Sequence, residues 1–195
     1  FLKIKYVIIK KIFKLDYNLP KVEYFFTYFY KINNYKIKKN SLKYFKKKYI
    51  TEHFHKNNIT YFLGQPLYND GPVTLDEYKK IIIKMKYLFK NEKIIYISHR
   101  HEKEEIFQFL TKNNIQYISI NDPFEIFLIK NKILPKNITS ISSTALVTCN
   151  LLFNNNESNI LKIHIADHYY KGDKTYLFID TKIKEYIDIN NIVRL

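Results

Sequence analysis

Two stretches of sequence decide the fold: Tyr61-Phe62-Leu63-Gly64-Gln65-Pro66 and Ile94-Ile95-Tyr96-Ile97-Ser98-His99-Arg100-His101-Glu102. Each is an apolar run, typical of a buried strand, that ends abruptly in a polar loop. The residues between the two runs have the spacing of one amphipathic helix. A strand–helix–strand unit puts its polar loops at the carboxyl ends of parallel strands, where open α/β sheets bind their ligands. We therefore expect a nucleotide-binding α/β domain with His99 in its site.

The helix between the two strands has a clear start signal. Thr74-Leu75-Asp76-Glu77 reads as a capping box, in which the side chains of Thr74 and Glu77 satisfy exposed backbone amides. The apolar residues that follow recur at helical spacing and predict one buried face. That face consists of Leu75, Tyr78, Ile82, Met85 and Phe89.

From residue 59 onward, apolar runs alternate with helical patterns. The sequence predicts strands at 59–63, 93–97, 116–120, 138–141 and 160–165. It predicts helices at 102–113, 123–130 and 143–153, and a helix plus a tail at 173–195. Short loops between alternating elements indicate a Rossmann-type parallel sheet with flanking helices and right-handed crossovers.

The first 58 residues follow a different pattern. They are expected to form irregular helices at 3–15 and 21–31, and a polar connection at 34–58. We therefore divide the chain into 1–58, a helical segment with a linker, and 59–195, a nucleotide-binding α/β domain. Because the first residue is Phe1 and the only methionine is Met85, we expect the chain to be truncated at its N-terminus.

The formal net charge of +15 raises the question of a polyanionic partner. The lysines are spread along the chain, and only the segment Lys36–Lys48 forms a cluster. That cluster is best explained as solvated surface, next as a contact with anionic lipid, and least well as a nucleic-acid contact.

Cys149 is the only cysteine, which excludes an internal disulfide and fits a reducing compartment. No apolar run approaches the roughly 18–20 residues that span a bilayer. We therefore expect a cytoplasmic protein, with peripheral contact to the inner membrane through Lys36–Lys48 left open. With only Gly64, Gly71 and Gly172 in the chain, a glycine-rich phosphate loop is excluded.

His99 is the first candidate for chemistry, because it follows a buried strand directly. Its imidazole could donate a hydrogen bond to a phosphate oxygen and stabilise charge on a leaving group. The alternative is a loop histidine without a role. A metal pair with His101 is disfavoured, since no third ligand lies nearby in the sequence, and no metal site or cofactor is expected.

Asp70 lies in Tyr68-Asn69-Asp70-Gly71-Pro72, where turn-forming residues alone explain its presence. Its functional alternative is a catalytic base at the carboxyl end of a strand. Ser142-Ser143-Thr144 marks a strand-to-helix transition, with Ser142 as a helix cap that could also hold a phosphate at the positive helix end. Glu125 lies two residues after Pro123. Its negative charge either interacts favourably with the positive end of the helix dipole or accepts hydrogen bonds from ribose hydroxyls.

Taken in order, these residues resemble bacterial glycosyltransferase family 52, which contains lipooligosaccharide and capsule sialyltransferases. The resemblance covers nearly the whole chain. It runs through the Gly-x-Pro turn, the histidine motif, the acidic residue after a proline, and a Ser-Ser-Thr-Ala-Leu turn. The residues are Gly64 and Pro66, His99 to Glu102, Pro123 to Glu125, and Ser142 to Leu146.

The resemblance implies a two-lobed GT-B fold that binds the nucleotide CMP mainly in its C-terminal lobe. It implies that His99 contacts the CMP phosphate, that the catalytic base maps near Asp70, and that Glu125 contacts the ribose. Nucleotide binding would also involve Gly64, Arg100, Pro123, Ser142, Ser143 and Thr144.

The sequence departs from the family pattern at three places. Arg100 replaces the proline that usually follows the histidine, and Leu67 occupies a position where the family acid can lie. The Asp-Asp-Gly motif of the N-terminal lobe is absent.

The expected activity is transfer of sialic acid from CMP-sialic acid to galactose on a bacterial surface glycan, with inversion and without a metal. A relative with another nucleotide sugar, such as a glucosyl donor, is the alternative within the same class. A basic module that binds nucleic acid or membrane, and a remnant without catalysis, are the alternatives outside it. A homo-oligomer is compatible with the sequence.

Overall fold

The computed structural model describes residues 25–27, 37–50, 53–69, 73–141, 143–153, 162–167 and 193–194. The chain divides into two compact units, Phe1–Asn40 and Ser41–Leu195. In the first unit, β1 (Phe25–Thr27) pairs in parallel with β2 (Ile37–Lys39). The helix predicted at 21–31 is therefore wrong over β1, because aromatic and threonine residues favour strands as readily as buried helices. The helix predicted at 3–15 lies outside the described residues.

The second unit begins with a short surface helix, α2 (Lys43–Tyr49). It follows Leu42, whose φ of 53° places it in the left-handed region, and it has no buried residues. Three lysines occupy its last turn, where positive charges interact favourably with the negative end of the helix dipole. The predicted polar connection at 34–58 thus contains β2, α2 and the start of the next strand.

A six-stranded parallel sheet forms the centre of this unit. Its strands are β3 (His55–Leu63), β4 (Lys93–Ser98), β5 (Gln116–Ser119), β6 (Ile133–Ser140), β7 (Lys162–Asp167) and β8 (Val193–Arg194). The order across the sheet is β5-β4-β3-β6-β7-β8, and all neighbouring pairs are parallel. The chain builds outward from β3 to β5 and then returns to the other side of β3, so the strand order reverses between β3 and β6. This confirms the Rossmann-type α/β fold.

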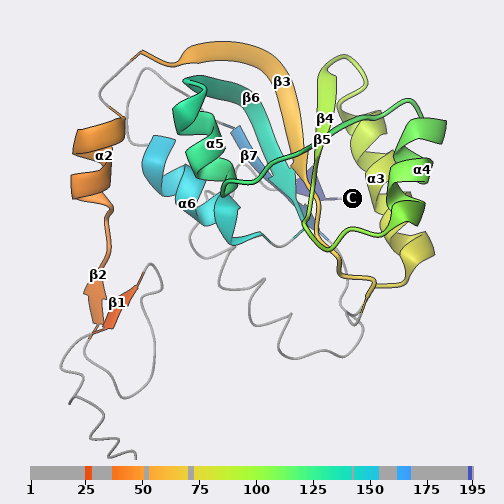
Figure 1. Ribbon diagram of the computed structural model, residues 1–195, viewed down its shortest axis with the longest axis horizontal. Coiled ribbons are helices and arrows are strands. Elements are labelled where there is room, and N and C mark those ends of the chain that lie inside the picture. Colours follow the sequence, from red (N-terminus) through yellow and green to blue (C-terminus); the bar gives the residue numbers. More distant parts are fainter. Residues whose placement is uncertain are drawn as a thin grey trace, which may run out of the picture. The chain divides into compact units, whose positions relative to one another are not determined.

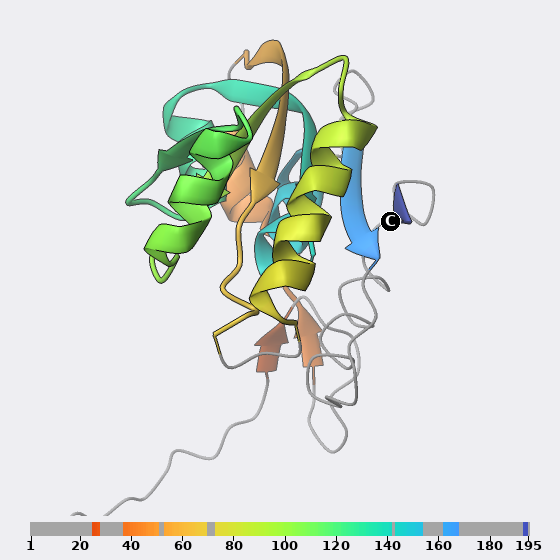
Figure 2. The same cartoon turned by 90° about the vertical axis from the view of Figure 1, so that its right-hand side faces the viewer.

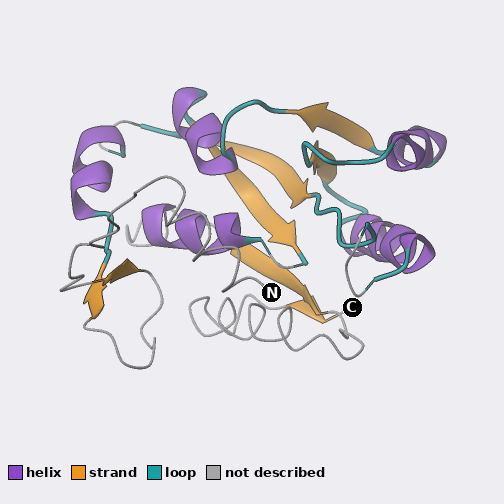
Figure 3. Cartoon of the chain, turned by 60° about the horizontal axis from the view of Figure 1, so that its bottom comes forward, coloured by secondary structure: helices purple, strands orange, loops and turns teal. Residues whose placement is uncertain are grey.

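Helices cover both faces of the sheet. The helices α3 (Leu75–Leu88) and α4 (Glu104–Lys112) lie side by side on one face (Figure 2). The helices α5 (Phe124–Lys130) and α6 (Thr144–Phe153) lie on the other (Figure 1). Figure 3 shows the strands between the two helical layers. This three-layer arrangement leaves the loops at the strand ends as the places where a ligand can reach the sheet.

The predicted elements agree best where the apolar pattern is regular. The capping box of α3 is confirmed, since Thr74 Oγ1 accepts from the Glu77 amide at 3.2 Å and the Thr74 amide donates to Glu77 Oε2 at 2.9 Å. The buried face of α3 contains Tyr78, Ile82 and Met85 as predicted, together with Ile81. It packs with Phe62, Tyr96, Ile106 and Leu110 into one core.

Two strands start earlier than predicted. β3 begins at His55 and not at residue 59, and β6 begins at Ile133 and not at residue 138. The early start of β6 is not predicted because the strand contains Pro135. Proline lacks a backbone hydrogen-bond donor and is rare in central strands. Here the pairing of β6 with β7 starts only at Asn137, so Pro135 pairs with β3 alone, next to an irregularity in the register.

The C-terminal prediction is tested only at its end. Residues 173–192 lie outside the described residues, and within the predicted tail Val193–Arg194 form strand β8. Within the described residues, no helix has both the length and the apolar character that crossing a membrane requires.

Candidate functional site

The centre of the carboxyl edge of the sheet lies between β3 and β6, where the strand order reverses. Ser140, the last residue of β6, donates a hydrogen bond from Oγ to the Leu63 carbonyl oxygen at the end of β3, over 2.9 Å. This bond joins the two central strands at the point where they give way to loops. In open α/β sheets, the crevice outside such a point is the usual place for a ligand.

His99 follows β4 and begins a tight turn. The amide of Glu102 donates to the carbonyl oxygen of His99 over 2.9 Å, which closes the turn. The amide of His101 donates to Nδ1 of the His99 ring over 3.2 Å. Because Nδ1 accepts this bond, a neutral His99 carries its proton on Nε2. The turn therefore leaves Nε2–H as the hydrogen-bond donor of the ring.

The surroundings of His99 favour its neutral form. Partial burial lowers the pKa of His99, and the charges of His101 and Arg100 lower it further. The negative charge of Glu102 acts in the opposite direction without reversing the result. The lowered pKa favours the neutral ring at neutral pH, and an anion beside the ring would favour its charged form.

Glu102 makes several side-chain hydrogen bonds in this turn; in the sequence it belongs to the histidine motif but has no predicted role. Its Oε1 accepts from the Tyr68 hydroxyl at 2.5 Å. Its Oε2 accepts from the Tyr96 hydroxyl at 2.8 Å and from the His99 amide at 3.2 Å. One carboxylate therefore joins the loop after β3, the strand β4 and the turn that carries His99.

The hydrogen bonds that lead to Glu102 all run in one direction. An ionised carboxylate only accepts, so Tyr96 must donate to Glu102 and accept from the Tyr78 hydroxyl, 2.9 Å away. Tyr78 in turn accepts from the Gln65 amide at 2.8 Å. Burial raises the pKa of both tyrosines, so both hydroxyls stay protonated. In such a chain, each hydrogen bond polarises the next hydroxyl and strengthens the neighbouring hydrogen bonds.

Gly64 is required by this network. A Cβ at Gly64 would lie 2.3 Å from the Tyr96 hydroxyl oxygen and 2.7 Å from Glu102 Oε2. Neither atom can move easily, because Tyr96 is fully buried and Glu102 is fixed by its three hydrogen bonds. The glycine of the Gly-x-Pro turn thus makes room for the tyrosine–carboxylate contact, and its predicted role in nucleotide binding remains a prediction.

The other predicted residues also follow carboxyl ends of strands. Arg100 lies exposed in the His99 turn, and Pro123 with Glu125 lies at the start of α5. Pro123 is the residue before α5, and its carbonyl oxygen accepts from the amides of Ile126 and Phe127. Because the strands are parallel, all of these positions lie at one edge of the sheet.

The start of α6 differs by one residue from the prediction. The helix begins at Thr144, so the capping position falls on Ser143, whose Oγ accepts from the Ala145 amide at 3.3 Å. Thr144 is exposed in the first turn. Ser142 lies outside the described residues, as does Asp70, so their predicted roles remain predictions.

The comparison with known families decides the class of the protein. Over residues 4–162, the sequence matches the family described as Alpha-2,8-polysialyltransferase (POLYST). The chain belongs to this family. The matched range includes the His99 turn, the contacts of Glu102 and the start of α6. Among curated proteins, none matches the sequence.

Membership in the polysialyltransferase family confirms the expectation of a sialyltransferase-like glycosyltransferase. A nucleotide-sugar donor and a glycan acceptor follow from it in general terms. The narrower resemblance to glycosyltransferase family 52, and the truncation expected from the sequence, remain predictions.

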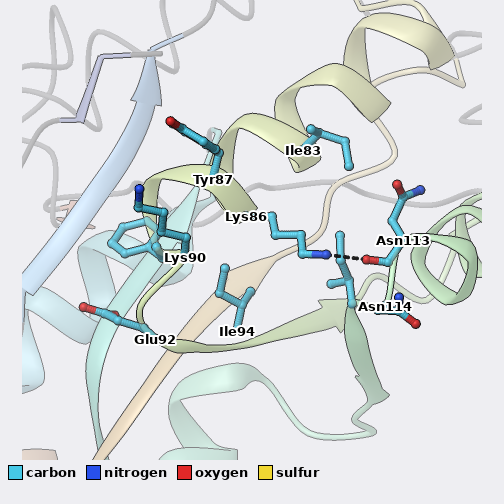
Figure 4. A pocket seen from close by; sticks show the side chains of 10 residues that line it. Ile83, Lys86, Tyr87, Lys90, Glu92, Ile94, Asn113 and Asn114 are labelled. Atoms are coloured by element: carbon cyan, nitrogen blue, oxygen red, sulfur yellow. Dashed lines mark hydrogen bonds between the residues drawn. The ribbon is translucent and has the colours of Figure 1, made fainter.

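A pocket of about 460 Å³ lies at the opposite end of the α3–α4 layer (Figure 4). Its lining comes from the end of α3, the start of β4 and the loop after α4, and Lys86 Nζ donates there to the Asn113 carbonyl oxygen over 2.6 Å. Ile94, at the amino end of β4, also lines the pocket. No predicted site residue lines this pocket, so it is separate from the His99 edge.

Cys149 on α6 is buried and has no disulfide partner. Burial raises the pKa of its thiol, and the negative charge of Glu125 adds to the effect. The carboxylate of Glu125 therefore acts electrostatically on α6 from the first turn of α5. Among the described residues, no group of three or more His, Cys, Asp or Glu side chains could hold a metal ion.

Proposed function

We propose that this chain carries the donor-binding part of a sialyltransferase that uses CMP-sialic acid. Membership in the polysialyltransferase family supports the reaction class. The position of His99, at the carboxyl end of a strand next to the reversal of strand order, is the observation that carries the proposal. In this proposal, residues 59–195 bind the nucleotide sugar, and residues 1–58 belong to the second lobe of a GT-B fold.

The chemistry follows from the state of His99. Its neutral ring, with the proton on Nε2, donates a hydrogen bond to the phosphate of CMP. As the bond between the anomeric carbon and the phosphate oxygen breaks, negative charge builds on CMP and this hydrogen bond strengthens. The sugar passes through an oxocarbenium-like state, the cation type also met in glycoside hydrolysis.

The remaining predicted residues act around this centre in the proposal. Asp70 removes the proton of the attacking hydroxyl, and attack from the face opposite CMP inverts the anomeric carbon. Ser142, Ser143 and Thr144, at the positive end of α6, bind the phosphate. Glu125 accepts from the ribose hydroxyls, while Gly64, Arg100 and Pro123 complete the nucleotide site. No metal takes part.

The proposal extends to the acceptor, for which two kinds of glycan are considered. The family description names an α-2,8 linkage, which favours a glycan that ends in sialic acid. A galactose-terminated surface glycan, expected from the resemblance to family 52, is the alternative. Assays with lactose and with sialyllactose separate the two, because only one of them ends in galactose.

The decisive experiment compares two histidines of the same turn. The full chain is incubated with CMP-sialic acid and either acceptor, and released CMP is measured for the wild type, His99→Ala and His101→Ala. His99→Ala should lose on the order of 10²–10⁴ in rate, as expected for a positioned acid–base group. His101→Ala should stay near the wild type, because its backbone amide still donates to His99 Nδ1. Equal rates for His99→Ala and the wild type would contradict the assignment.

Binding separates the remaining alternatives. In calorimetry, CMP should bind more tightly than UDP, and His99→Ala should weaken CMP binding. Tighter binding of UDP would point to a different nucleotide sugar, and CMP binding without turnover would point to a remnant without catalysis. Absence of binding by both nucleotides would contradict the proposal of a donor-binding part.

We also propose that the basic cluster Lys36–Lys48 contacts anionic lipid at the inner membrane face of a bacterial cell. Its described helical part, α2, exposes Tyr44 and Tyr49 beside lysines, and Lys48 Nζ lies 5.0 Å from the centre of the Tyr49 ring. Aromatic and basic side chains together suit a lipid headgroup layer. Sedimentation with anionic but not neutral vesicles would support this contact, and equal sedimentation with both would contradict it.

A further inference from the structure

We propose that Glu102 is a positioning residue that fixes the orientation and protonation of His99. This inference rests on the proposed function for the role of His99 in transfer. The contacts that carry it are properties of the folded chain and can be tested without any substrate.

The first argument is geometric, because Glu102 holds the His99 turn from two sides. Within the turn, its side chain accepts from the His99 amide and its own amide donates to the His99 carbonyl oxygen. Outside the turn, Tyr68 and Tyr96 donate to the same carboxylate. Through Glu102, the backbone amide and carbonyl of His99 are thereby linked to the buried strand β4 and to the loop after β3.

The second argument concerns the neighbouring loop, which is joined to the turn by additional bonds. The Lys103 amide donates to the Tyr68 hydroxyl over 3.1 Å, so that hydroxyl links Glu102 to the start of α4. Asn69 Nδ2 lies 3.4 Å from the His101 carbonyl oxygen, at the long end of hydrogen-bond distances. The loop that leads to Asp70 and the turn that carries His99 therefore share a common anchor.

The third argument is that the carboxylate of Glu102 accepts the last hydrogen bond of a buried chain. The hydroxyls of Tyr78 and Tyr96 are fully buried, and their chain of donors ends on Glu102. Without this acceptor, the Tyr96 hydroxyl proton would be buried without a partner, which is costly in a protein interior. The turn would have to shift to satisfy it.

The fourth argument is electrostatic. The groups that act on the His99 ring are Glu102, His101 and Arg100, all from its own turn. Among them, Glu102 carries the only negative charge. The charge of Glu102 thus raises the pKa of His99 against the effects of burial, His101 and Arg100. A phosphate that binds beside the ring therefore needs to raise this pKa less for His99 to become charged.

The test compares three variants of the full chain. Glu102→Gln removes the charge but keeps a side chain of the same size with one acceptor oxygen. Tyr68→Phe removes one hydroxyl donor and keeps the carboxylate. Glu104→Gln is the matched control, because Glu104 is an exposed acid in the first turn of α4.

The first readout is the titration of His99, followed by NMR of imidazole carbons and nitrogens and assigned by its loss in His99→Asn. We expect a lower midpoint and a mixture of ring tautomers in Glu102→Gln, since both the charge and the anchor of the turn are weakened. Tyr68→Phe should keep the midpoint and change the tautomer balance. Glu104→Gln should match the wild type. If Glu102→Gln titrates like Glu104→Gln, with the same tautomer, the inference is wrong.

The second readout is turnover of CMP-sialic acid. Glu102→Gln should lower kcat on the order of 10–100-fold with a smaller change in KM, as expected for misplacement of a reacting group. Glu104→Gln should leave both unchanged. The two readouts also separate the claims. A chain without transferase activity, but with a His99 titration that depends on Glu102, would overturn the proposed function alone. An active chain indifferent to Glu102 would overturn this inference alone.

Discussion

Two carboxylates of this domain, Glu102 and Glu92, each accept several hydrogen bonds, but their partners belong to different parts of the structure. Glu102 accepts from two tyrosine hydroxyls and a loop amide, after the carboxyl end of β4. Glu92, just before the amino end of β4, accepts from the Thr60 hydroxyl, from Asn137 Nδ2 at 2.7 Å and from Lys136 Nζ at 2.7 Å.

The difference between the two lies in what their partners belong to. The partners of Glu92 are residues of the central strands β3 and β6, and a lysine neutralises its charge. Among the described contacts of Glu102 there is no cation, and one partner is the backbone of the turn that carries His99. The comparison indicates that Glu92 stabilises the sheet, whereas the charge of Glu102 lies beside the turn that carries His99.

The largest expected effect comes from filling the space beside Glu102. Gly64→Ala should lower the free energy of unfolding by about 3 kcal/mol, at the upper end of the usual cost of overpacking, because the new Cβ would overlap Tyr96 and Glu102. Urea denaturation measures this change. Adding Tyr96→Phe removes one of the overlapping atoms, so the double variant should lose less than the sum of the two single losses. Strictly additive losses would show that the overlap is relieved in some other way.

A smaller loss is expected at Glu92, and it should leave the His99 turn untouched. Glu92→Gln should lower the free energy of unfolding by about 2 kcal/mol, the range for hydrogen bonds to a charged group. The His99 titration and the rate per folded molecule should not change. A loss of activity without a loss of stability would reverse the contrast between the two carboxylates.

The same variant should show a defined pH dependence. Burial acts to raise the pKa of Glu92, but its hydrogen bonds with Lys136, Thr60 and Asn137 outweigh burial, and the pKa lies below its usual 4.5. A lowered carboxyl pKa stabilises the fold above 4.5 and loses that contribution as the pH falls through the folded value. The stability difference between wild type and Glu92→Gln should therefore shrink below pH 4.5 in denaturation curves. A constant difference down to the acid limit would exclude the ion pair as its source.

The smallest effect is expected from the titration of His99 itself. The folded pKa of His99 lies below its usual 6.5, so the unfolded chain binds the proton first as the pH falls. Stability should decrease below pH 6.5 for this reason, and His99→Gln should remove that part of the decrease. Thermal unfolding of the wild type and of His99→Gln between pH 5 and 7.5 measures this difference.

Sequence alone predicts the sheet well wherever apolar runs are bounded by turn residues. The runs that end at Leu63 and Ser98, and the capping box at Thr74, fall where the periodicity places them. Pro135 and the aromatic segment around Phe25 are misjudged, because their strands depend on pairing with distant residues and not on local preference. Tertiary pairing overrides propensity at such positions.

The surroundings of His99 are predicted only in part for a related reason. Its position directly after a buried strand is predicted correctly, and its role in a site remains a proposal. The partners of Glu102 are not found, since Tyr68 lies 34 residues away in the sequence and no periodicity connects them. One signal was available: Tyr96 interrupts a buried run of isoleucines, and a buried tyrosine hydroxyl needs a hydrogen-bond partner.

The burial of Cys149 has a practical consequence for labelling this protein. The only thiol of the chain is inaccessible and stays protonated, so it should react very slowly with maleimides under native conditions. A cysteine introduced at an exposed position, such as Tyr87 or Tyr117, could then be modified selectively in the otherwise native chain. Fluorescent probes on α3 or β5 would thereby become accessible without first removing Cys149 from the packed α6 layer.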